Sequence, residues 1–309
     1  MQYEHLNMLN EEIKAQNSIV ESNRSAVTKK NNQLLEIYKN NDKQNKTLTQ
    51  NLIFAKQIQS SLLPAPATLE QTFNDFFILY KPSEYVGGDF YWFHQTSQYT
   101  FIILADCTGH GVPGAFISVL GKTLLDKIIM EQKLYDPAEI LLQLHKETTE
   151  ALATGKEGKC YEELLDDGMD IAICRFSKNF DKLTFAGARR PVVLILNNEI
   201  KEIKGEKFSI GSYTRQSRWK KDILFTNHHV DIKDNCLCYL FSDGYSNQMS
   251  QKNGKIGAKR FRELIRENYS KPFNEQKAVF EGFFDEHKKD QDQTDDMSVV
   301  GVKVSRTKN

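Results

Sequence analysis

Four acidic motifs lie far apart in the sequence, and each stands beside a strand-like apolar run. They are Gly87-Gly88-Asp89-Phe90, Ala105-Asp106-Cys107-Thr108-Gly109-His110-Gly111, Phe241-Ser242-Asp243-Gly244 and Asp295-Asp296-Met297. Carboxylates at the ends of several strands can converge at one end of a β core. Carboxylates and backbone carbonyls together make a hard-oxygen site, which suits Mg²⁺ or Mn²⁺ rather than a metal that prefers thiolates. This pattern predicts metal-assisted hydrolysis of a phosphate ester.

Composition and charge exclude several classes of protein. The 309 residues are 39% hydrophobic, which is enough for one sizeable core and an extension. Lys+Arg and Asp+Glu number 41 each, so nothing indicates a nucleic-acid partner or a polybasic membrane anchor. No apolar run approaches the roughly 18 residues of a membrane span. The N-terminus lacks the basic segment followed by an apolar segment that a signal peptide has. The cysteines form neither a CxxC pair nor a disulfide framework, so we expect a cytoplasmic protein.

Residues 1–62 contain no Gly, Pro or Trp and fit a seven-residue repeat. The d column is half polar, whereas the a column is apolar except for Asn41. The a positions are Leu6, Ile13, Val20, Val27, Leu34, Asn41, Leu48, Ala55 and Leu62. β-branched residues at a favour a parallel dimer, and a single Asn at a commonly fixes the register. We therefore expect a dimeric coiled-coil signalling helix over 1–62, ended by Pro64 and Pro66; the alternative is a single polar helix that frays.

Residues 63–309 are predicted to form one domain by size. Expected strands lie near 75–81, 89–94, 99–105, 169–176, 182–186, 192–196, 223–230, 236–242 and 297–304. Expected helices lie near 113–131, 137–153, 257–269 and 274–288. Strands outnumber helices and mostly follow one another directly, which favours an α+β fold of antiparallel sheets flanked by helices over a doubly wound parallel sheet.

Each acidic motif also has an ordinary structural explanation when it is taken alone. Asp106 and the glycines after it could form a Gly-rich turn between a strand and a helix, and Ser-Asp-Gly at 242–244 is a common turn. An Asp pair before a strand is ordinary as well, and the segment around Asp89 could be a β bulge. The prediction of a shared site depends on all four motifs occurring together.

As a set, the motifs resemble a bacterial metal-dependent serine/threonine protein phosphatase of the PPM (PP2C-like) class, in the SpoIIE/RsbU-like branch. Further matching elements are Ala55-Lys56-Gln57-Ile58-Gln59-Ser60-Ser61-Leu62-Leu63-Pro64, Gly168-Met169-Asp170-Ile171-Ala172, Phe185-Ala186-Gly187-Ala188 and Ser298 after Met297. The match extends over residues 55–304. It implies an αββα sandwich with a two-metal centre, occupied by Mn²⁺ or Mg²⁺, at one end.

The resemblance assigns roles residue by residue. Asp106 would bridge both metals, and the backbone carbonyl of Cys107 would be a ligand. Asp243 and Asp295 would bind one metal, with Asp295 preferred over Asp296 by its distance from Met297. Asp89 would lie in the same shell. A weaker third metal would contact Asp166, Asp167 or Asp170. Asp106, Asp243 and Asp295 would thus carry catalysis, in which a metal-activated water attacks phosphorus directly.

Two departures from the wider phosphatase class concern charge near the phosphate. Thr108 stands where many eukaryotic relatives have a His proposed as a general acid, and His110 comes two residues later as either an acid or a loop residue. No Arg precedes Asp89 locally; Arg189 or Arg190 could supply the charge or be structural. Cys107 is not expected to be a nucleophile, because the Cys-x5-Arg phosphate cradle is absent.

Two other functions compete with this interpretation. The Gly-Gly-Asp-Phe sequence at 87–90 resembles the signature of a diguanylate cyclase, but Tyr91 follows Phe90 and the second acidic residue of that signature is absent. A non-catalytic signalling scaffold is the second alternative, and the presence of all the acidic ligand positions argues against it.

We therefore expect a phosphatase that acts on phosphoserine or phosphothreonine in a partner regulator. In this family, the partner is often a STAS-type anti-sigma antagonist. We expect the coiled coil to regulate the catalytic domain through residues 55–64. The chain is also expected to be the output end of a longer sensor.

Overall fold

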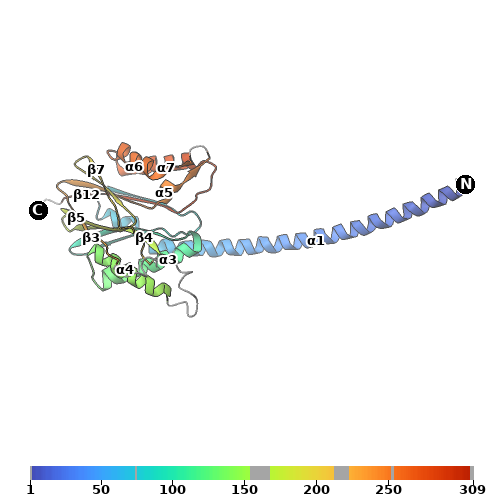
Figure 1. The fold of residues 1–309 in the computed structure, drawn as a ribbon, viewed down its shortest axis with the longest axis horizontal. Helices are drawn as coiled ribbons and strands as arrows, with labels where there is room; N and C mark the ends of the chain where they lie inside the picture. The colour runs from blue at the N-terminus through green and yellow to red at the C-terminus, as the bar shows by residue number, and fades with distance from the viewer. Residues whose placement is uncertain (1, 74, 154–167, 212–222, 252–253, 307–309) are drawn as a thin grey trace. The chain divides into compact units, whose positions relative to one another are not determined.

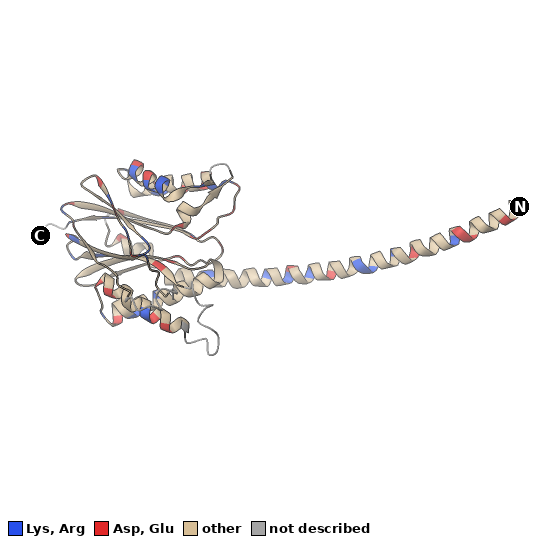
Figure 2. Ribbon diagram, viewed as in Figure 1, with Lys and Arg blue, Asp and Glu red and all other residues tan. Residues whose placement is uncertain are grey.

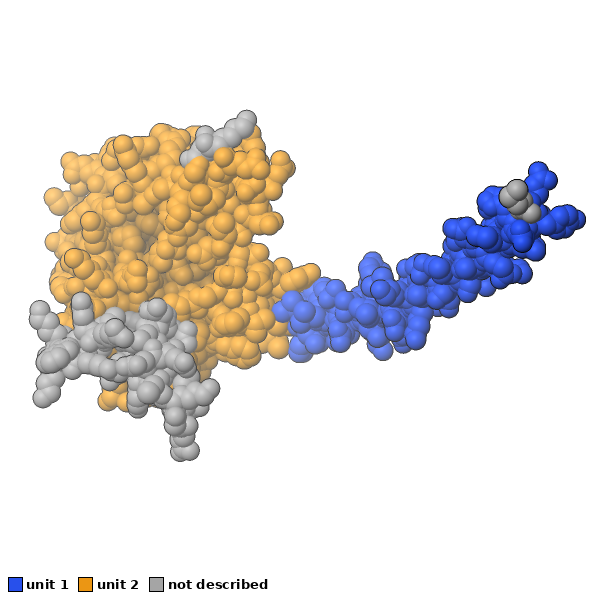
Figure 3. Space-filling model, turned by 45° about the vertical axis from the view of Figure 1, so that its right-hand side comes forward, with its two compact units in different colours: residues 1–54 blue, residues 55–309 orange. Residues whose placement is uncertain are grey.

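The computed structural model describes residues 2–73, 75–153, 168–211, 223–251 and 254–306. They belong to two compact units, residues 1–54 and residues 55–309, which Figure 3 colours separately. Asp166 and Asp167, expected as contacts of a weaker third metal, lie outside the described residues.

The first unit is helical throughout its described residues. Helix α1 spans Gln2–Leu62, and its last residues belong to the second unit. The absence of Gly and Pro explains why nothing interrupts the helix. The apolar a positions are exposed in the single chain; Leu6, Val27 and Leu34 are 63%, 56% and 62% exposed. Charges of both signs are interspersed along α1 (Figure 2). The helix is confirmed, whereas its pairing into a coiled coil stays a prediction.

The second unit contains two five-stranded antiparallel sheets. The first has the order β1-β12-β9-β6-β7, with strands Asp75–Lys81, Met297–Ser305, Asn235–Phe241, Val192–Leu196 and Glu199–Ile203. The second has the order β2-β3-β4-β5-β8, with strands Phe90–Gln95, Tyr99–Cys107, Met169–Ser177, Lys182–Ala188 and His228–Asp231. A small hairpin pairs β10 (Met249–Ser250) with β11 (Gly254–Lys255).

Helices cover the outer face of each sheet, as Figure 1 shows. Helix α3 (Gly111–Leu125), its π-helical continuation η1 (Asp126–Glu131) and α4 (Pro137–Ala153) pack on the second sheet. Helices α6 (Gly257–Asn268) and α7 (Phe273–Lys288) pack on the first. The short helices are α2 (Pro66–Glu70) and α5 (Gly244–Asn247).

The alternation of side chains along each strand produces three apolar layers. In β3, Ile102 and Leu104 face the other sheet, while Ile103 faces α3 and α4. In β12, Val300 faces the other sheet, while Val299 faces α6 and α7. Because successive side chains of a strand point to opposite faces, each sheet can bury both faces. The resulting αββα sandwich confirms the predicted fold class.

Two strands differ from the expectation. The strand predicted over 223–230 is wrong at its beginning, since pairing starts only at His228. Asn227 donates from Nδ2 to both carboxylate oxygens of Asp136 at 2.7 Å and accepts from the backbone of Ala138, which ties it to the start of α4. Strand β7 was not predicted; it follows a tight turn in which Asn197 and Asn198 have φ of 52° and 64°.

Within the described ranges, no helix combines the length and the apolar character that crossing a membrane requires.

Candidate metal centre

The topology brings the predicted acidic residues to one end of the two sheets. Asp89 comes directly before β2, and Asp106 lies near the end of β3, where it is opposite Asp170 of β4. In the other sheet, Asp243 follows β9 and Asp295 precedes β12. Because neighbouring strands are antiparallel, the end of one strand lies beside the start of the next. The carboxylates of both sheets therefore meet across the gap between them.

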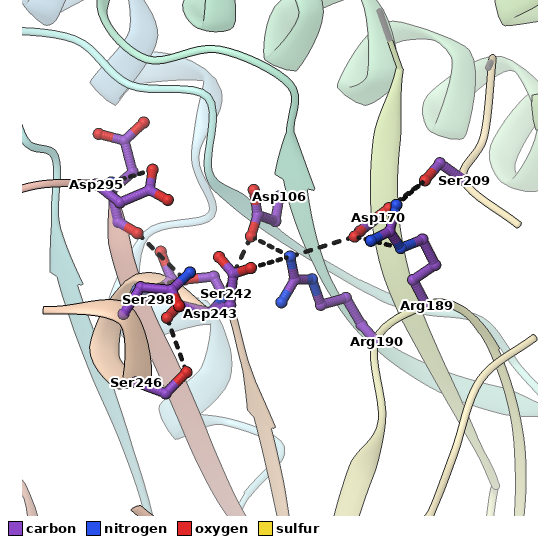
Figure 4. A network of polar contacts seen from close by, with 12 residues as sticks. Asp106, Asp170, Arg189, Arg190, Ser209, Ser242, Asp243, Ser246, Asp295 and Ser298 are labelled. Carbon is purple, nitrogen blue, oxygen red and sulfur yellow. Dashed lines mark hydrogen bonds and ion pairs between the residues drawn. The ribbon is translucent and has the colours of Figure 1, made fainter. Parts of the chain in front are cut away.

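Asp106 and Asp243 are linked directly at this meeting point. The backbone N–H of Asp243 donates to Oδ2 of Asp106 at 3.5 Å, and Nη2 of Arg190 lies 2.8 Å from the same oxygen. The same Nη2 is 3.2 Å from Oδ2 of Asp170 and 3.2 Å from Oδ2 of Asp243. Figure 4 shows the Arg190 side chain among these three carboxylates. One guanidinium thus joins acidic residues from both sheets.

Burial and mutual repulsion dominate the electrostatics of Asp106. Burial raises the pKa of Asp106 to about 8; Arg190 opposes this rise, and Asp243, Asp295 and Asp170 add to it. Burial lowers the pKa of Arg190, but Asp106, Asp243 and Asp170 together raise it by more. The arginine is therefore firmly charged, yet its single charge does not neutralise the surrounding carboxylates.

Asp89 and Asp295 experience the same two effects. Burial raises the pKa of Asp89 well above its ordinary range, and the charge of Asp106 adds to the rise. Asp89 is 2% exposed, and its Oδ2 has no hydrogen-bond partner among the described residues. Burial likewise raises the pKa of Asp295, helped by Asp243. A buried carboxylate oxygen without a donor needs a cation or a proton.

The adjacent Asp295 and Asp296 have different surroundings. Asp296 is 4% exposed and accepts hydrogen bonds from the backbone N–H and Oγ of Ser83, at 2.7 and 2.9 Å, and from the N–H of Gly88, at 2.6 Å. It thereby fixes the loop that carries Asp89. Asp295 instead lines an open cleft together with Asp106 and Asp243. These contacts favour Asp295 as the candidate ligand of the pair.

Close backbone packing surrounds the predicted carbonyl ligand Cys107. A Cβ atom on Gly88 would lie 2.9 Å from the carbonyl oxygen of Cys107 and 2.8 Å from that of Gly109. A Cβ on Gly114 would lie 2.2 Å from the oxygen of Gly109. Glycine is therefore required at 88 and 114 for the loops before β2 and after β3 to approach each other.

Thr108 and His110, which differ from the wider phosphatase class, have different surroundings in the structure. Thr108 exchanges hydrogen bonds with the backbone of Gly168: the Gly168 N–H donates to Oγ1 at 2.7 Å, and Oγ1 donates to the Gly168 oxygen at 3.1 Å. Thr108 therefore joins the ends of β3 and β4. His110 is 61% exposed at its side chain, and its Nδ1 lies 2.7 Å from Oε1 of Glu84 at the rim of the site.

A cleft of about 540 Å³ opens over the carboxylates. Besides the acidic residues, it exposes cationic side chains from the segments that follow β5 and β7. Its lining residues are Asp106, Cys107, Thr108, Gly109, His110, Asp170, Arg189, Arg190, Lys207, Phe208, Ser209, Asp243, Thr294 and Asp295. The cleft thus combines oxygen donors for a metal with positive charge for an anion.

The chemistry of the donors fits a hard divalent ion. In the part of the chain described, no set of three or more His, Cys, Asp and Glu side chains already encloses a metal position. The Arg190 guanidinium lies among the carboxylates instead. The unpartnered Oδ2 of Asp89 and the pKa values of Asp89 and Asp106, raised first by burial and then by neighbouring carboxylates, indicate that the cluster needs a cation or protons in addition to Arg190. Oxygen donors with excess negative charge are what Mg²⁺ and Mn²⁺ prefer.

Sequence reasoning missed two contacts at this site. It left the role of Arg190 open, since two consecutive arginines give no local signal of an ion pair. It also did not single out Gln59. This residue is 7% exposed and is the only buried residue of α1, all of which the structure describes. Gln59 donates from Nε2 to the Gly87 oxygen at 2.6 Å and to Oγ of Ser118 at 2.9 Å, and it accepts from the Gly87 N–H at 3.2 Å.

Comparison with models of protein families shows which family the sequence matches. The model of a family described as stage II sporulation protein E (SpoIIE) matches residues 96–305. No curated protein matches the chain significantly.

Solved structures with the same fold include phosphatase domains. The SiaA-PP2C domain of Pseudomonas aeruginosa has a TM-score of 0.73 and 28% identity, with 84% of this chain and 98% of that chain covered. The PP2C domain of SpoIIE from Bacillus subtilis, with a fragment of its regulatory domain, has a TM-score of 0.59 and 14% identity over 74% of this chain and 63% of that chain. The latter similarity shows the fold alone.

The raised pKa of Asp106 predicts the pH dependence of the metal-free protein. A carboxyl whose pKa is about 8 when folded, against 3.8 ordinarily, binds its proton more tightly in the folded state. Its contribution to stability is complete below about pH 4 and is lost as the pH rises through about 8. Each unit of difference corresponds to about 1.4 kcal/mol. Denaturant unfolding in EDTA should therefore show stability falling between pH 5 and 8.

Asp106→Asn removes the titrating group and should flatten this dependence, whereas Asp292→Asn at an exposed position should leave it unchanged. A stability of the wild-type chain in EDTA that rises steadily over this pH range would contradict the electrostatic description of the cluster.

Proposed function

Because the chain belongs to the SpoIIE family of PP2C-like phosphatases, we propose that it is a metal-dependent protein phosphatase acting on phosphoserine or phosphothreonine. One observation carries the proposal: Asp106, Asp243 and Asp295 come from both sheets to a single cleft, and Asp89 is buried close enough to Asp106 for the two charges to interact. A structural role alone does not account for so many carboxylates in one place, because burying them is costly.

Asp106, Asp243 and Asp295 would hold the divalent ions, with Asp89 and the carbonyl oxygen of Cys107 completing the oxygen donors. Bound Mn²⁺ or Mg²⁺ would lower the pKa of a water molecule and neutralise negative charge on the phosphoryl group. The protein's own part is to keep these carboxylates aligned. Asp296 does so by fixing the loop before Asp89, and Thr108 does so by joining β3 to β4.

Cationic side chains beside the carboxylates suit a phosphorylated substrate. Arg189, Arg190 and Lys207 line the same cleft. Guanidinium groups bind phosphate oxygens in a planar, bidentate manner, while a lysine acts as a point charge. These cationic side chains suit a phosphorylated side chain, and we propose a small partner regulator, such as a STAS-type anti-sigma antagonist, as the substrate.

Hydrolysis of p-nitrophenyl phosphate and of a phosphoserine peptide tests the activity. We expect turnover with Mn²⁺ or Mg²⁺ and none in EDTA. Asp106→Asn and Asp295→Asn should each lower kcat/KM by about 100-fold or more, since even the outer partners of metal ligands typically contribute roughly 10–100-fold.

Asp292→Asn is the matched control and should retain full activity, because Asp292 is exposed and outside the cleft. Turnover that persists in EDTA, or that survives in both of the cleft variants, would refute metal-dependent catalysis by these carboxylates.

We propose that α1 regulates the site through Gln59. Its side chain bonds the backbone of Gly87, two residues before Asp89, and it also contacts Ser118 of α3. A displacement of the last turns of α1 would break these bonds and leave buried backbone groups of Gly87 unpaired. An unpaired buried group costs about 1–3 kcal/mol, which is enough to shift the loop that carries Asp89.

Gln59→Leu should therefore lower metal-dependent activity about tenfold and raise the Mn²⁺ concentration needed for half-maximal rate, since about 1.4 kcal/mol corresponds to tenfold. Gln57→Leu, at an exposed position of the same helix, should change neither. Equal Mn²⁺ dependence in the two variants would exclude Gln59 as the link.

The exposed apolar seam of α1 supports a parallel homodimer. Sedimentation equilibrium of the full chain should give a dimer, and Val27→Asp should shift it toward monomer because a charge would enter the seam. Ser25→Asp, on an exposed position two residues earlier, should keep the dimer. A wild-type chain that is monomeric at every concentration would contradict pairing through residues 1–62.

A further inference from the structure

Arg190 is at the centre of the acidic cluster. Its Nη2 atom lies 2.8 Å from Asp106, 3.2 Å from Asp170 and 3.2 Å from Asp243. Figure 4 shows its side chain entering between the two sheets from the link that joins β5 to β6. The side chain is 12% exposed. A single nitrogen therefore stands where several carboxylate oxygens converge, which is the kind of position that a bound cation takes.

The backbone of this link is held firmly. Arg189 has a φ of 57°, in the left-handed region, and its N–H donates to the oxygen of Glu206 at 2.7 Å. A Cβ atom on Gly187 would lie 2.4 Å from the oxygen of Arg190 and 3.1 Å from Cα of Gly205, so the turn is closely packed on itself and on the segment after β7. Non-glycine residues in this region persist only where their surroundings enforce them, and they cluster at functional sites. Any movement of Arg190 must therefore occur in its side chain.

Asp170 differs from the other two partners of Arg190. Ser209 donates from Oγ to Asp170 at 2.5 Å, and Nε of Arg189 lies 3.5 Å from its carboxylate. Asp106 and Asp243, by contrast, are the carboxylates expected to hold a divalent ion. A guanidinium and a divalent ion cannot share these oxygens, because like charges a few ångströms apart repel each other, and the repulsion is strong where Arg190 and Asp106 are largely buried. Arg190 can keep Asp170 as a partner when it leaves the other two.

We propose that Arg190 is a displaceable internal cation: it pairs with Asp106 and Asp243 when no divalent ion is bound, and it withdraws toward Asp170 when ions enter. The inference rests on the proposed function, because it concerns the same carboxylates. It adds that competition from Arg190 sets the metal concentration at which the site fills. The buried Nε of Arg190, which has no partner among the described residues, agrees with a side chain that is not locked in one arrangement.

Calorimetric titration of the full chain with Mn²⁺ tests this competition in the absence of substrate. Arg190→Met keeps the aliphatic stem and removes the competing charge, so the Kd for Mn²⁺ should tighten about tenfold, which corresponds to about 1.4 kcal/mol. Arg266→Met is the control; Arg266 is exposed on α6 and does not line the cleft, so the Kd for Mn²⁺ should stay within about twofold of the wild type. An unchanged or weaker Kd in Arg190→Met overturns the proposal.

A measurement on the wild-type chain keeps the test valid if Arg190→Met does not fold. The Nε–H resonance of Arg190, followed by NMR during titration with Mg²⁺, should move with the same midpoint as metal binding. A resonance that does not move at saturation overturns the proposal.

Phosphatase assays on the same samples separate the two claims. Hydrolysis with equal Kd values in the wild type and Arg190→Met would overturn the role of Arg190 alone. A tightened Kd without hydrolysis in any sample would overturn the proposed function and retain the role of Arg190.

Discussion

The burial of neighbouring carboxylates is the constraint on which the acidic end of the second unit depends. Asp89, Asp106, Asp243 and Asp295 are brought together by the topology, and burial raises the pKa of three of them, Asp89, Asp106 and Asp295. Such a cluster is tolerated only when cations or protons balance it. Arg190 supplies one positive charge, and the remaining imbalance is what makes the site suitable for divalent ions. The topology that brings the carboxylates together thus also creates the charge that favours divalent ions.

The sandwich can carry this cost because its apolar layers are extensive and separate from the cluster. Each sheet buries one face against the other sheet and one against helices. This packing positions the strand ends that carry the carboxylates. Where loops must approach closely, glycine at 88 and 114 removes the steric obstacle. The site therefore relies on packing beyond the cleft for its geometry, as preorganised sites generally do.

Much of this arrangement could be predicted from the sequence, because local patterns determine it. The uninterrupted helix follows from a segment without Gly or Pro, and the strand ends beside Asp106 and Asp243 follow from apolar runs that stop at an acidic residue. The expected strand over 223–230 was wrong at its beginning because Asn227 binds the start of α4, a contact with a residue 91 positions away. No local pattern reports such a contact.

The same limit applies to the site. The sequence could place Asp295 and Asp296 side by side, but only the folded loop shows that Asp296 is occupied by Ser83 and Gly88. Gln59 lay within a segment that matched the family, yet its burial depends on Gly87 and Ser118. Arg190 was ambiguous for the same reason, since an arginine after a strand becomes an internal cation only when three carboxylates surround it.

Anomalous diffraction can show whether Asp106, Asp243 and Asp295 form one metal centre. Crystals of the full chain grown with Mn²⁺ and measured at the manganese edge should show anomalous peaks between Asp106, Asp243 and Asp295, within ligand distance of their oxygens. The guanidinium of Arg190 should then lie away from Asp106 and Asp243. Crystals that contain Mn²⁺ but show no peak among these residues, with Arg190 still bridging them, would contradict the account.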